Sequence, residues 1–315
     1  MTVATLLLPR RRYLGGSLGR NVATMLSRAH RMHARPGELA QLRRYFTYPA
    51  AHWPIAAMTR TVDNAQDTAV EHTQQALWLR ADPAWVQPDI TGARLLGYGP
   101  SLQLEQQDAE AFTPTLHSLF AEHGLVFDAP VPTRWYIRLP TQSTVPHFSP
   151  PEDALGDDVL DYMPDGAEAA HWGMLLAQAQ MLLHQHPRNI HRRAEGKPCI
   201  NSLWFWGEGR MQAAMHTQYQ YIQSQDVLLQ AIAQMCGLLH TTNQDKSDAP
   251  TIIDLRHMRS LQELVDQVFL PVIDALRTGQ LRQCIADFQD GLVIAMRPSS
   301  RWHFWKTTQW QLDAL

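Results

Sequence analysis

Hydrophobic positions recur along the chain with two spacings, and these predict an alternation of strands and helices. Apolar residues three and four positions apart, the period of an amphipathic helix, predict helices with one buried face. Short apolar runs bounded by glycine, proline or polar residues predict buried strands. The helical pattern covers residues 18–32, 107–123, 167–184, 223–239 and 261–277, and the strand-like runs cover residues 2–8, 200–206 and 251–255. This alternation is typical of an α/β protein.

A second group of short strands surrounds one of these helices. The strand-like runs at residues 77–80, 94–98, 125–127 and 134–139 flank helix 107–123. Because proline and glycine bound this group, we expect a separate α/β subdomain. The polar, aperiodic residues 62–75 before it predict a linker or exposed turn. Towards the C-terminus, residues 281–286 and 292–297 predict a β-hairpin.

Composition narrows the class of protein without naming a function. The chain has 315 residues, of which 45% are hydrophobic and 18% charged, which is ordinary for a soluble globular protein. The three cysteines lie far apart, so neither a disulfide framework nor a CxxC zinc site is predicted. The apolar run Val3–Leu8 is too short for a signal peptide, and no run reaches the ~18 apolar residues of a membrane span. We therefore expect a cytoplasmic protein that does not enter a membrane.

The charges are unevenly distributed along the chain. Residues 1–46 carry nine arginines and one acid, whereas residues 147–168 carry seven acids and no base. This asymmetry predicts either an internal electrostatic contact or an N-terminal patch that faces an anion. The aromatic and basic tail at residues 301–310 has side chains suited to stacking on nucleic acid bases. Such tails more often pack against a core, and the net charge of −3 does not favour a nucleic-acid partner.

The segment from His184 to Gly209 carries the densest candidate chemistry. It places three histidines and three arginines within ten residues, followed by a Gly-Lys-Pro turn and an apolar run that ends in glycines. Because arginine forks suit carboxylate and phosphate groups, the segment predicts a site for a small anion. The predicted ligand-facing residues are Arg80, Arg188, Asn189, Arg192, Arg193 and Asn201. Alternatively, these arginines pair with the acidic segment Glu152–Glu168.

Four motifs carry a resemblance to a known family. They are LRADP at residues 79–83, RWY at 134–136, DYMPDG at 161–166 and NSLWFWGEG at 201–209. In these motifs the chain resembles a bacterial regulatory protein family of the pathogenicity-factor regulation cluster, often described as phosphoglycerate-mutase-like. The resemblance covers most of the chain and implies a protein partner that the sequence does not identify.

The order of parts is also remotely similar to that of the archaeal-type, cofactor-independent phosphoglycerate mutases of the alkaline-phosphatase superfamily. The matching places are held by His186, Pro187, Asn189, Arg192, Asn201, Gly207 and Gly209. This resemblance implies an α/β fold with a reduced, alkaline-phosphatase-like three-layer core and an inserted smaller α/β domain. The implied core is discontinuous, at residues 1–76 and 196–315, and the implied insertion covers residues 77–195 with its acidic, proline-rich loop at 141–166.

The catalytic parts of that superfamily lack counterparts here. Its chemistry requires a Ser or Thr nucleophile between two divalent ions that Asp and His side chains hold. In this chain the first strand runs into Pro9 and Arg10 rather than an Asp-Gly metal ligand, and Ala50-Ala51-His52 stands where the nucleophile is expected. Arg256 and its neighbours replace a metal-binding motif after Asp254. Cationic side chains at such places repel Mn²⁺ or Zn²⁺.

The sequence thus favours a catalytically degenerate phosphoglycerate-mutase-like protein with a regulatory or ligand-binding role and no metal or cofactor. One alternative is an active, metal-dependent phosphoglycerate mutase or phosphohydrolase. Its metal site would be assembled from Asp254, His257, Asp287, Asp290 and His303. A second alternative is a nucleic-acid-binding protein that uses the arginine-rich N-terminus and the aromatic tail.

Overall fold

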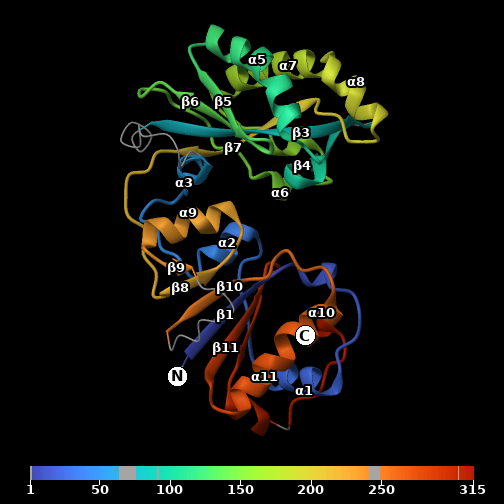
Figure 1. Cartoon of the computed structure of the whole chain (residues 1–315), viewed down its shortest axis with the longest axis vertical. Coiled ribbons are helices and arrows are strands. Elements are labelled where there is room, and N and C mark those ends of the chain that lie inside the picture. Colours follow the sequence, from blue (N-terminus) through green and yellow to red (C-terminus); the bar gives the residue numbers. More distant parts are fainter. Residues whose placement is uncertain (1, 64–75, 91, 241–248, 304) are drawn as a thin grey trace. The chain divides into compact units, whose positions relative to one another are not determined.

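The computed structural model describes residues 2–63, 76–90, 92–240, 249–303 and 305–315 (Figure 1). The chain divides into two compact units, residues 1–49 with 214–315 (unit 1) and residues 50–213 (unit 2). Each unit combines helices with its own sheet, so the predicted α/β class is confirmed. From residue 64 on, the predicted linker at 62–75 lies outside the described residues.

Unit 1 is built on a seven-stranded sheet in the order β2-β12-β11-β1-β10-β8-β9. The strands are β1 (Thr2–Leu8), β2 (His30–His33), β8 (Tyr221–Gln223), β9 (Leu239–His240), β10 (Thr251–Asp254), β11 (Leu281–Phe288) and β12 (Leu292–Met296). Strand β1 runs parallel to both of its neighbours, β10 and β11. Its side chains Leu6, Leu7 and Leu8 are fully buried, as the continuous apolar run requires of a central parallel strand.

Helices cover both faces of this sheet (Figure 1). On one face lie α1 (Arg20–Arg28), α10 (Leu261–Leu264) and α11 (Leu270–Arg277), whose apolar side chains form one core with β1, β11 and β12. On the other face lie α2 (Glu38–Leu42) and α9 (Val227–Cys236). Short 3₁₀ turns at Arg11–Tyr13, Pro298–Trp302 and Leu312–Ala314 complete the unit.

Two predicted helices of unit 1 differ from expectation. The helix predicted at 18–32 ends at Arg28, because His30–His33 pairs as strand β2 with β12 and sheet pairing there outweighs helical periodicity. The helix predicted at 261–277 contains a wide π turn at Val265–Phe269, separated from Pro271 by Leu270. Proline lacks an N–H and its ring crowds the preceding turn, and a wider turn accommodates both effects.

Unit 2 is organised around the long strand β3 (Leu77–Pro88). It pairs antiparallel with β6 (Arg134–Leu139), β4 (Ala93–Tyr98) and β7 (Ser202–Gly209), and β5 (Val126–Val131) pairs with β6. Helices α5 (Gln106–Glu122) and α7 (Ala169–His184) pack on one face of the sheet, and α3 (Ile55–Asp63) packs on the other (Figure 1). The remaining helices are α6 (Pro151–Ala154), α8 (Pro187–Ala194) and 3₁₀ turns at Gly99–Leu102 and Val159–Tyr162.

The boundaries of the inserted unit differ from the sequence-based ones. The structure divides after residues 49 and 213, whereas the sequence placed the divisions at 76 and 196. The reason is that β7 pairs with β3 from Ser202 to Gly209, and α3 packs against both of these strands. A buried apolar run identifies a strand but does not say which sheet it joins. The chain leaves unit 1 after residue 49 and returns to it at residue 214. Near these two points Thr47 and His216 of unit 1 pair through backbone N–H···O bonds of 2.9 Å, so both connections begin at neighbouring positions of unit 1.

Among the described residues, no helix has the length and apolar character that crossing a membrane requires.

Candidate functional site

The parallel strands of unit 1 end at one edge of the sheet, and charged side chains gather there. Asp254 is the last residue of β10, and Asp287 precedes the last residue of β11; these two strands flank β1. The carboxyl edge of a parallel sheet is where α/β proteins bind their ligands. We call the group formed by Glu38, Arg44, Asp226, Asp254, Arg256 and Asp287 the edge cluster.

Arg256 stands at the centre of three carboxylates. Its Nε donates to Asp254 Oδ1 at 2.8 Å, its Nη1 to Glu38 Oε1 at 2.6 Å, and its Nη2 lies 3.3 Å from Asp226 Oδ1. A second bond from Nη2 to Asp254 Oδ2, at 3.0 Å, makes the pairing with Asp254 two-pronged. Arg256 is 8% exposed, so this cation is fixed inside the edge rather than displayed on the surface.

The surroundings act on the protonation of these groups in opposite directions. Burial would lower the pKa of Arg256, but the three carboxylates raise it well above its ordinary value. Burial would raise the pKa of Asp254, but hydrogen bonds from Arg256 and Ser224 lower it overall. The pKa of Asp226 is raised by burial, and the charges of Glu38 and Asp254 add to this shift. Asp254 is therefore the firmly ionised partner, and Asp226 is the carboxylate that takes up a proton more readily.

Asp287 is held by a second arginine. Arg44 donates to both carboxylate oxygens, at 2.6 and 2.7 Å, and the Tyr45 hydroxyl donates to Oδ2 at 2.5 Å. Gln41 in α2 fixes the backbone beside it by donating to the carbonyl oxygens of Asp287 and Leu8. Asp287 is fully buried, and burial raises the pKa of its carboxyl although Arg44 and Tyr45 act to lower it.

These contacts test whether the edge fits a divalent metal. The described part of the chain contains no group of three or more His, Cys, Asp or Glu side chains arranged to hold a metal ion. Asp254 and Asp287 share their oxygens with guanidinium groups, and Asp290 accepts from Arg11 at 2.8 Å. His303 bonds instead to the carbonyl oxygen of Arg28. The donor set does not fit a two-metal centre, because its carboxylates already face cations.

The predicted anion-binding arginines of unit 2 have internal partners. Arg80 is buried and donates to both oxygens of Asp82, at 2.8 and 2.7 Å. Arg188 and Arg192 converge on Asp108 of α5, at 2.6 and 2.5 Å, and Arg192 is fully buried. The alternative that Arg188 and Arg192 pair with the acidic segment Glu152–Glu168 is wrong. A single buried carboxylate from another helix takes that place.

The other three predicted residues hold local structure. The Asn189 side chain donates to the carbonyl oxygens of Leu183 and Ile200 and accepts from the Ile200 N–H, so it ties α8 to the start of β7. Asn201 bonds to the N–H and carbonyl oxygen of Val86 in β3. Arg193 lies exposed, 3.4 Å from the Cys199 sulfur. The structure thus joins Arg188 and Arg192 at one carboxylate and gives Arg80 another, while the anion site itself stays a prediction.

The glycines at the end of β7 have a steric role. Gly207 and Gly209 adopt φ values of +68° and +150°, which other residues rarely adopt. A Cβ on Gly209 would lie 2.7 Å from Pro54 Cβ and 2.9 Å from Pro54 Cα. The GEG motif therefore permits the close approach of the segment that begins α3.

The edge cluster was only partly visible in the sequence. Asp254 and Asp287 were named as candidate ligands of an alternative metal site, and Arg256 was noted only as a cation that would repel metal. Glu38, Arg44 and Asp226 were missed, because they lie on or beside helices far from those strands in sequence. The excess of arginine over acidic residues in residues 1–46 was the one sequence feature that indicated acidic partners elsewhere for arginines such as Arg44.

The fold and the edge cluster define an α/β protein whose sheet edge is closed by arginine–carboxylate pairs. No protein-family model matches the chain. Parts of the chain are similar to curated 2,3-bisphosphoglycerate-independent phosphoglycerate mutases. The protein of that name from Methanosarcina barkeri is 38% identical over 61 residues, covering 19% of this chain and 15% of that protein. A probable enzyme of the same name from Geobacter sulfurreducens is 35% identical over 72 residues, covering 22% and 18%.

These matches span less than a fifth of the relatives' own length. Solved structures give longer and weaker similarities. A cofactor-independent phosphoglycerate mutase from Thermoplasma acidophilum aligns with 93% of this chain and 88% of its own, at 13% identity and a TM-score of 0.43. A protein from Pyrococcus horikoshii aligns with 94% and 87%, at 12% identity and a TM-score of 0.42. The chain is thus remotely similar in sequence to cofactor-independent phosphoglycerate mutases.

Proposed function

We propose that this chain is a catalytically degenerate, phosphoglycerate-mutase-like protein with a regulatory or ligand-binding role. The proposal includes a reduced alkaline-phosphatase-like core in unit 1 and a location in the cytoplasm. One observation carries it: the guanidinium group of Arg256 lies among Glu38, Asp226 and Asp254, at the sheet edge where ligands bind.

The physical argument concerns charge. Three carboxylates that converge on one point need a cation, and a divalent ion supplies it in metal-dependent phosphoryl transfer. Here the guanidinium group of Arg256, which is part of the chain, supplies this positive charge. Arg256 cannot give up its charge at any relevant pH, and it offers no open coordination position to a phosphate and a nucleophile. The similarity to phosphoglycerate mutases supports descent from such enzymes, while the arginine pairs support loss of the reaction.

The test is an assay of the purified chain with 2- and 3-phosphoglycerate in the presence of Mn²⁺. We expect no turnover above that of a no-protein control, and no stoichiometric Mn or Zn in the purified protein. Turnover that Asp254→Asn abolishes would overturn the proposal in favour of an active, metal-dependent enzyme. The exposed variant Asp274→Asn is the matched control, since its carboxylate is 73% exposed and lies outside the edge cluster.

The ligand of the proposed role is a small phosphate- or carboxylate-bearing molecule, as the arginine-rich segment of unit 2 predicts. Calorimetric titration with 3-phosphoglycerate checks this part separately. Binding that Arg193→Ala weakens, with no turnover, is the expected result, because Arg193 is exposed and has no acidic partner among the described residues. Absence of heat change at millimolar ligand would remove phosphoglycerate as the ligand.

A further inference from the structure

Helix α7 of unit 2 has an unusual composition for a helix at a protein surface. None of its 16 residues is Asp, Glu, Lys or Arg, and its polar residues are two histidines and two glutamines. A helix that is apolar around its whole circumference is ordinarily buried on every side. If one side of such a helix is open, that side is a candidate surface for another molecule.

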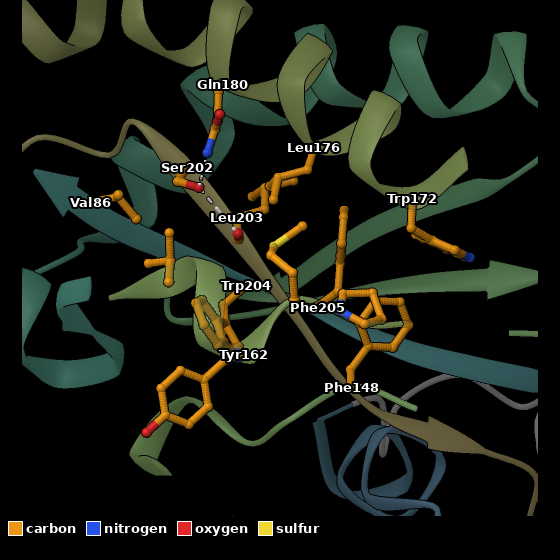
Figure 2. A pocket seen from close by; sticks show the side chains of 13 residues that line it. Val86, Phe148, Tyr162, Trp172, Leu176, Gln180, Ser202, Leu203, Trp204 and Phe205 are labelled. Atoms are coloured by element: carbon orange, nitrogen blue, oxygen red, sulfur yellow. Dashed lines mark hydrogen bonds between the residues drawn. The ribbon is translucent and has the colours of Figure 1, made fainter. Parts of the chain in front are cut away.

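The inward side of α7 packs on the sheet of unit 2. The Trp172 ring lies against Phe205 of β7, with ring centroids 5.1 Å apart, and Gln180 Nε2 donates to Ser202 Oγ at 3.0 Å (Figure 2). The other buried side chains of the helix are Leu175, Ala179 and Leu183. Their spacing of three and four positions places them on one face of the helix with Trp172.

The opposite side of α7 is open to solvent. At 3.6 residues per turn, Ala170, Met174, Ala177 and Met181 lie on one face, about half a turn from the buried one. Met174 is 44% exposed, Met181 is 59% exposed, and both alanines are exposed. We call these four residues the outer stripe. Helix α5 packs on the same face of the sheet, but its exposed side carries polar and charged residues such as Glu110.

The two ends of α7 carry opposite charges. Exposed Asp161, Asp165 and Glu168 precede the helix, in the stretch 147–168 that has no lysine or arginine. Exposed His191 and Arg193 follow it in α8. A second α7 that lies antiparallel to the first brings an acidic end against a basic end twice, whereas a parallel one brings like charges together.

We infer that the outer stripe is the contact surface of a symmetric dimer, in which α7 packs antiparallel on α7 of a second copy of this chain. A two-fold axis at Ala177 makes the contact self-complementary, so Met174 of each protomer meets Met181 of the other. The small Ala177 side chain on the axis permits a close approach of the two helices. The contact involves unit 2 and does not depend on the proposed loss of catalysis in unit 1.

The dimensions of α7 predict the strength of this association. Its 16 residues make a helix about 24 Å long and about 10 Å wide. The footprint of about 240 Å² per protomer, even with the flanking segments added, falls short of the ~800 Å² per partner of a stable interface. The dimer is therefore weak and reversible, with an expected dissociation constant of about 10–100 µM.

Sedimentation equilibrium of the full chain at about 5 to 500 µM measures the association. We expect the mass to rise from that of one chain towards that of two across this range. The mass of a single chain at the highest concentration overturns the inference. Binding of that monomer to phosphatidylglycerol vesicles would assign the outer stripe to a membrane surface instead.

Matched glutamate variants locate the contact. Met181→Glu places an unpaired carboxylate in the contact twice, once from each protomer, so the dissociation constant should rise about a hundredfold. Ala177→Glu, on the axis, should have a similar effect, and both positions are exposed in the single chain. The control Ser118→Glu on the exposed side of α5 should stay within about twofold. Unchanged association of both folded stripe variants overturns the inference.

Oxidative cross-linking tests the position of the axis. In a background that carries Cys199→Ser and Cys236→Ser, an added Ala177→Cys lies beside its own symmetry mate. Oxidation should therefore join two chains through this position and leave the control Ser118→Cys as single chains. Equal cross-linking of the two cysteine variants overturns the inference.

Salt tests the antiparallel orientation. Because the charged ends of α7 are exposed, raising NaCl from about 50 to 500 mM should weaken the dimer severalfold. Association that tightens with salt would show that like ends meet, and would overturn the antiparallel arrangement.

Discussion

Arg256 behaves as a built-in counter-ion, and its removal has a predictable cost. Arg256→Met leaves Glu38, Asp226 and Asp254 close together without a cation. We expect a loss of about 3–5 kcal/mol in the free energy of unfolding at pH 7, because breaking a buried ion pair strands the partner charges. Urea unfolding measures this loss.

The surface variant Arg277→Met is the control, since Arg277 is 58% exposed and its partner Asp274 is 73% exposed. It should change the stability by less than about 0.5 kcal/mol. Mn²⁺ or Ca²⁺ should raise the melting temperature of Arg256→Met and leave that of the unaltered protein unchanged. Equal stability of the two methionine variants would contradict the counter-ion role.

Asp254 and Asp226 should respond to pH in opposite ways. The pKa of Asp254 is lowered in the folded state, so its contribution to stability is present above its unfolded pKa of 3.8 and is lost as pH falls below that value. The pKa of Asp226 is raised, so its contribution declines as pH rises above 3.8. At pH 7 Asp254→Asn should therefore cost about 1.5–3 kcal/mol.

Asp226→Asn should be nearly neutral at pH 7, since asparagine also caps a helix and Asp226 accepts from the Leu229 N–H at the start of α9. Unfolding free energies of both variants between pH 3 and pH 8 provide the comparison. The assignment fails if Asp226→Asn proves the more costly change at pH 7.

Asp108 of α5 shows the same principle in unit 2. It is the shared acceptor of Arg188 and Arg192, and Arg192 is fully buried. Asp108→Ala should destabilise the chain by about 3–5 kcal/mol, because a buried guanidinium group loses its partner. Glu110→Ala, an exposed position on the same helix, should cost less than about 0.5 kcal/mol. Thermal unfolding of the two variants distinguishes this structural role from a purely ligand-facing one.

At the scale of single elements, the junction of β7 and α3 depends on glycine. Gly209→Ala brings a Cβ within 2.9 Å of two Pro54 atoms at a φ of +150°, so we expect a loss of about 2–4 kcal/mol. Gly173→Ala in α7 meets no atom within 4 Å and should stabilise the helix by about 0.5–1 kcal/mol. Circular dichroism melts of the two alanine variants give the comparison. A stable Gly209→Ala protein would mean that this approach is not tight.

The sequence predicted most of these elements but not their partners. Apolar periodicity located β1, β10 and helices α5 and α7, because burial imposes a period on local sequence. It also identified 200–206 as a strand. The division implied by the family resemblance placed this strand in the core at 196–315, whereas β7 pairs with β3, more than a hundred positions away in sequence. The anion-site residues were chosen for their chemistry. Asp82, the acceptor of Arg80, lies two positions away in the same LRADP motif. Asp108, the acceptor of Arg188 and Arg192, lies 80 and 84 positions away and carries no local signature.

At the scale of the whole molecule, the two units differ in continuity: two separate segments of the chain form unit 1, and one segment forms unit 2. Unit 2 is one continuous segment with its own sheet and with cores on both faces. We expect residues 50–213 expressed alone to fold, because every strand of that sheet comes from this segment. Dispersed amide NMR signals and a cooperative melt would bear this out. A disordered fragment would show that unit 1 is needed for unit 2 to fold.

The position of β1 in its sheet has a kinetic consequence. Both of its neighbours come from the last quarter of the chain: Ala4 pairs in register with Thr251 on one side and with Cys284 on the other. During synthesis on the ribosome, β1 therefore has no partner strand on either side until more than two hundred further residues, including all of unit 2, have been made. Unpaired apolar strands of this kind are sites of aggregation and of chaperone engagement. We expect nascent chains that stop before β10 to bind chaperones through β1, and release to follow synthesis of β11.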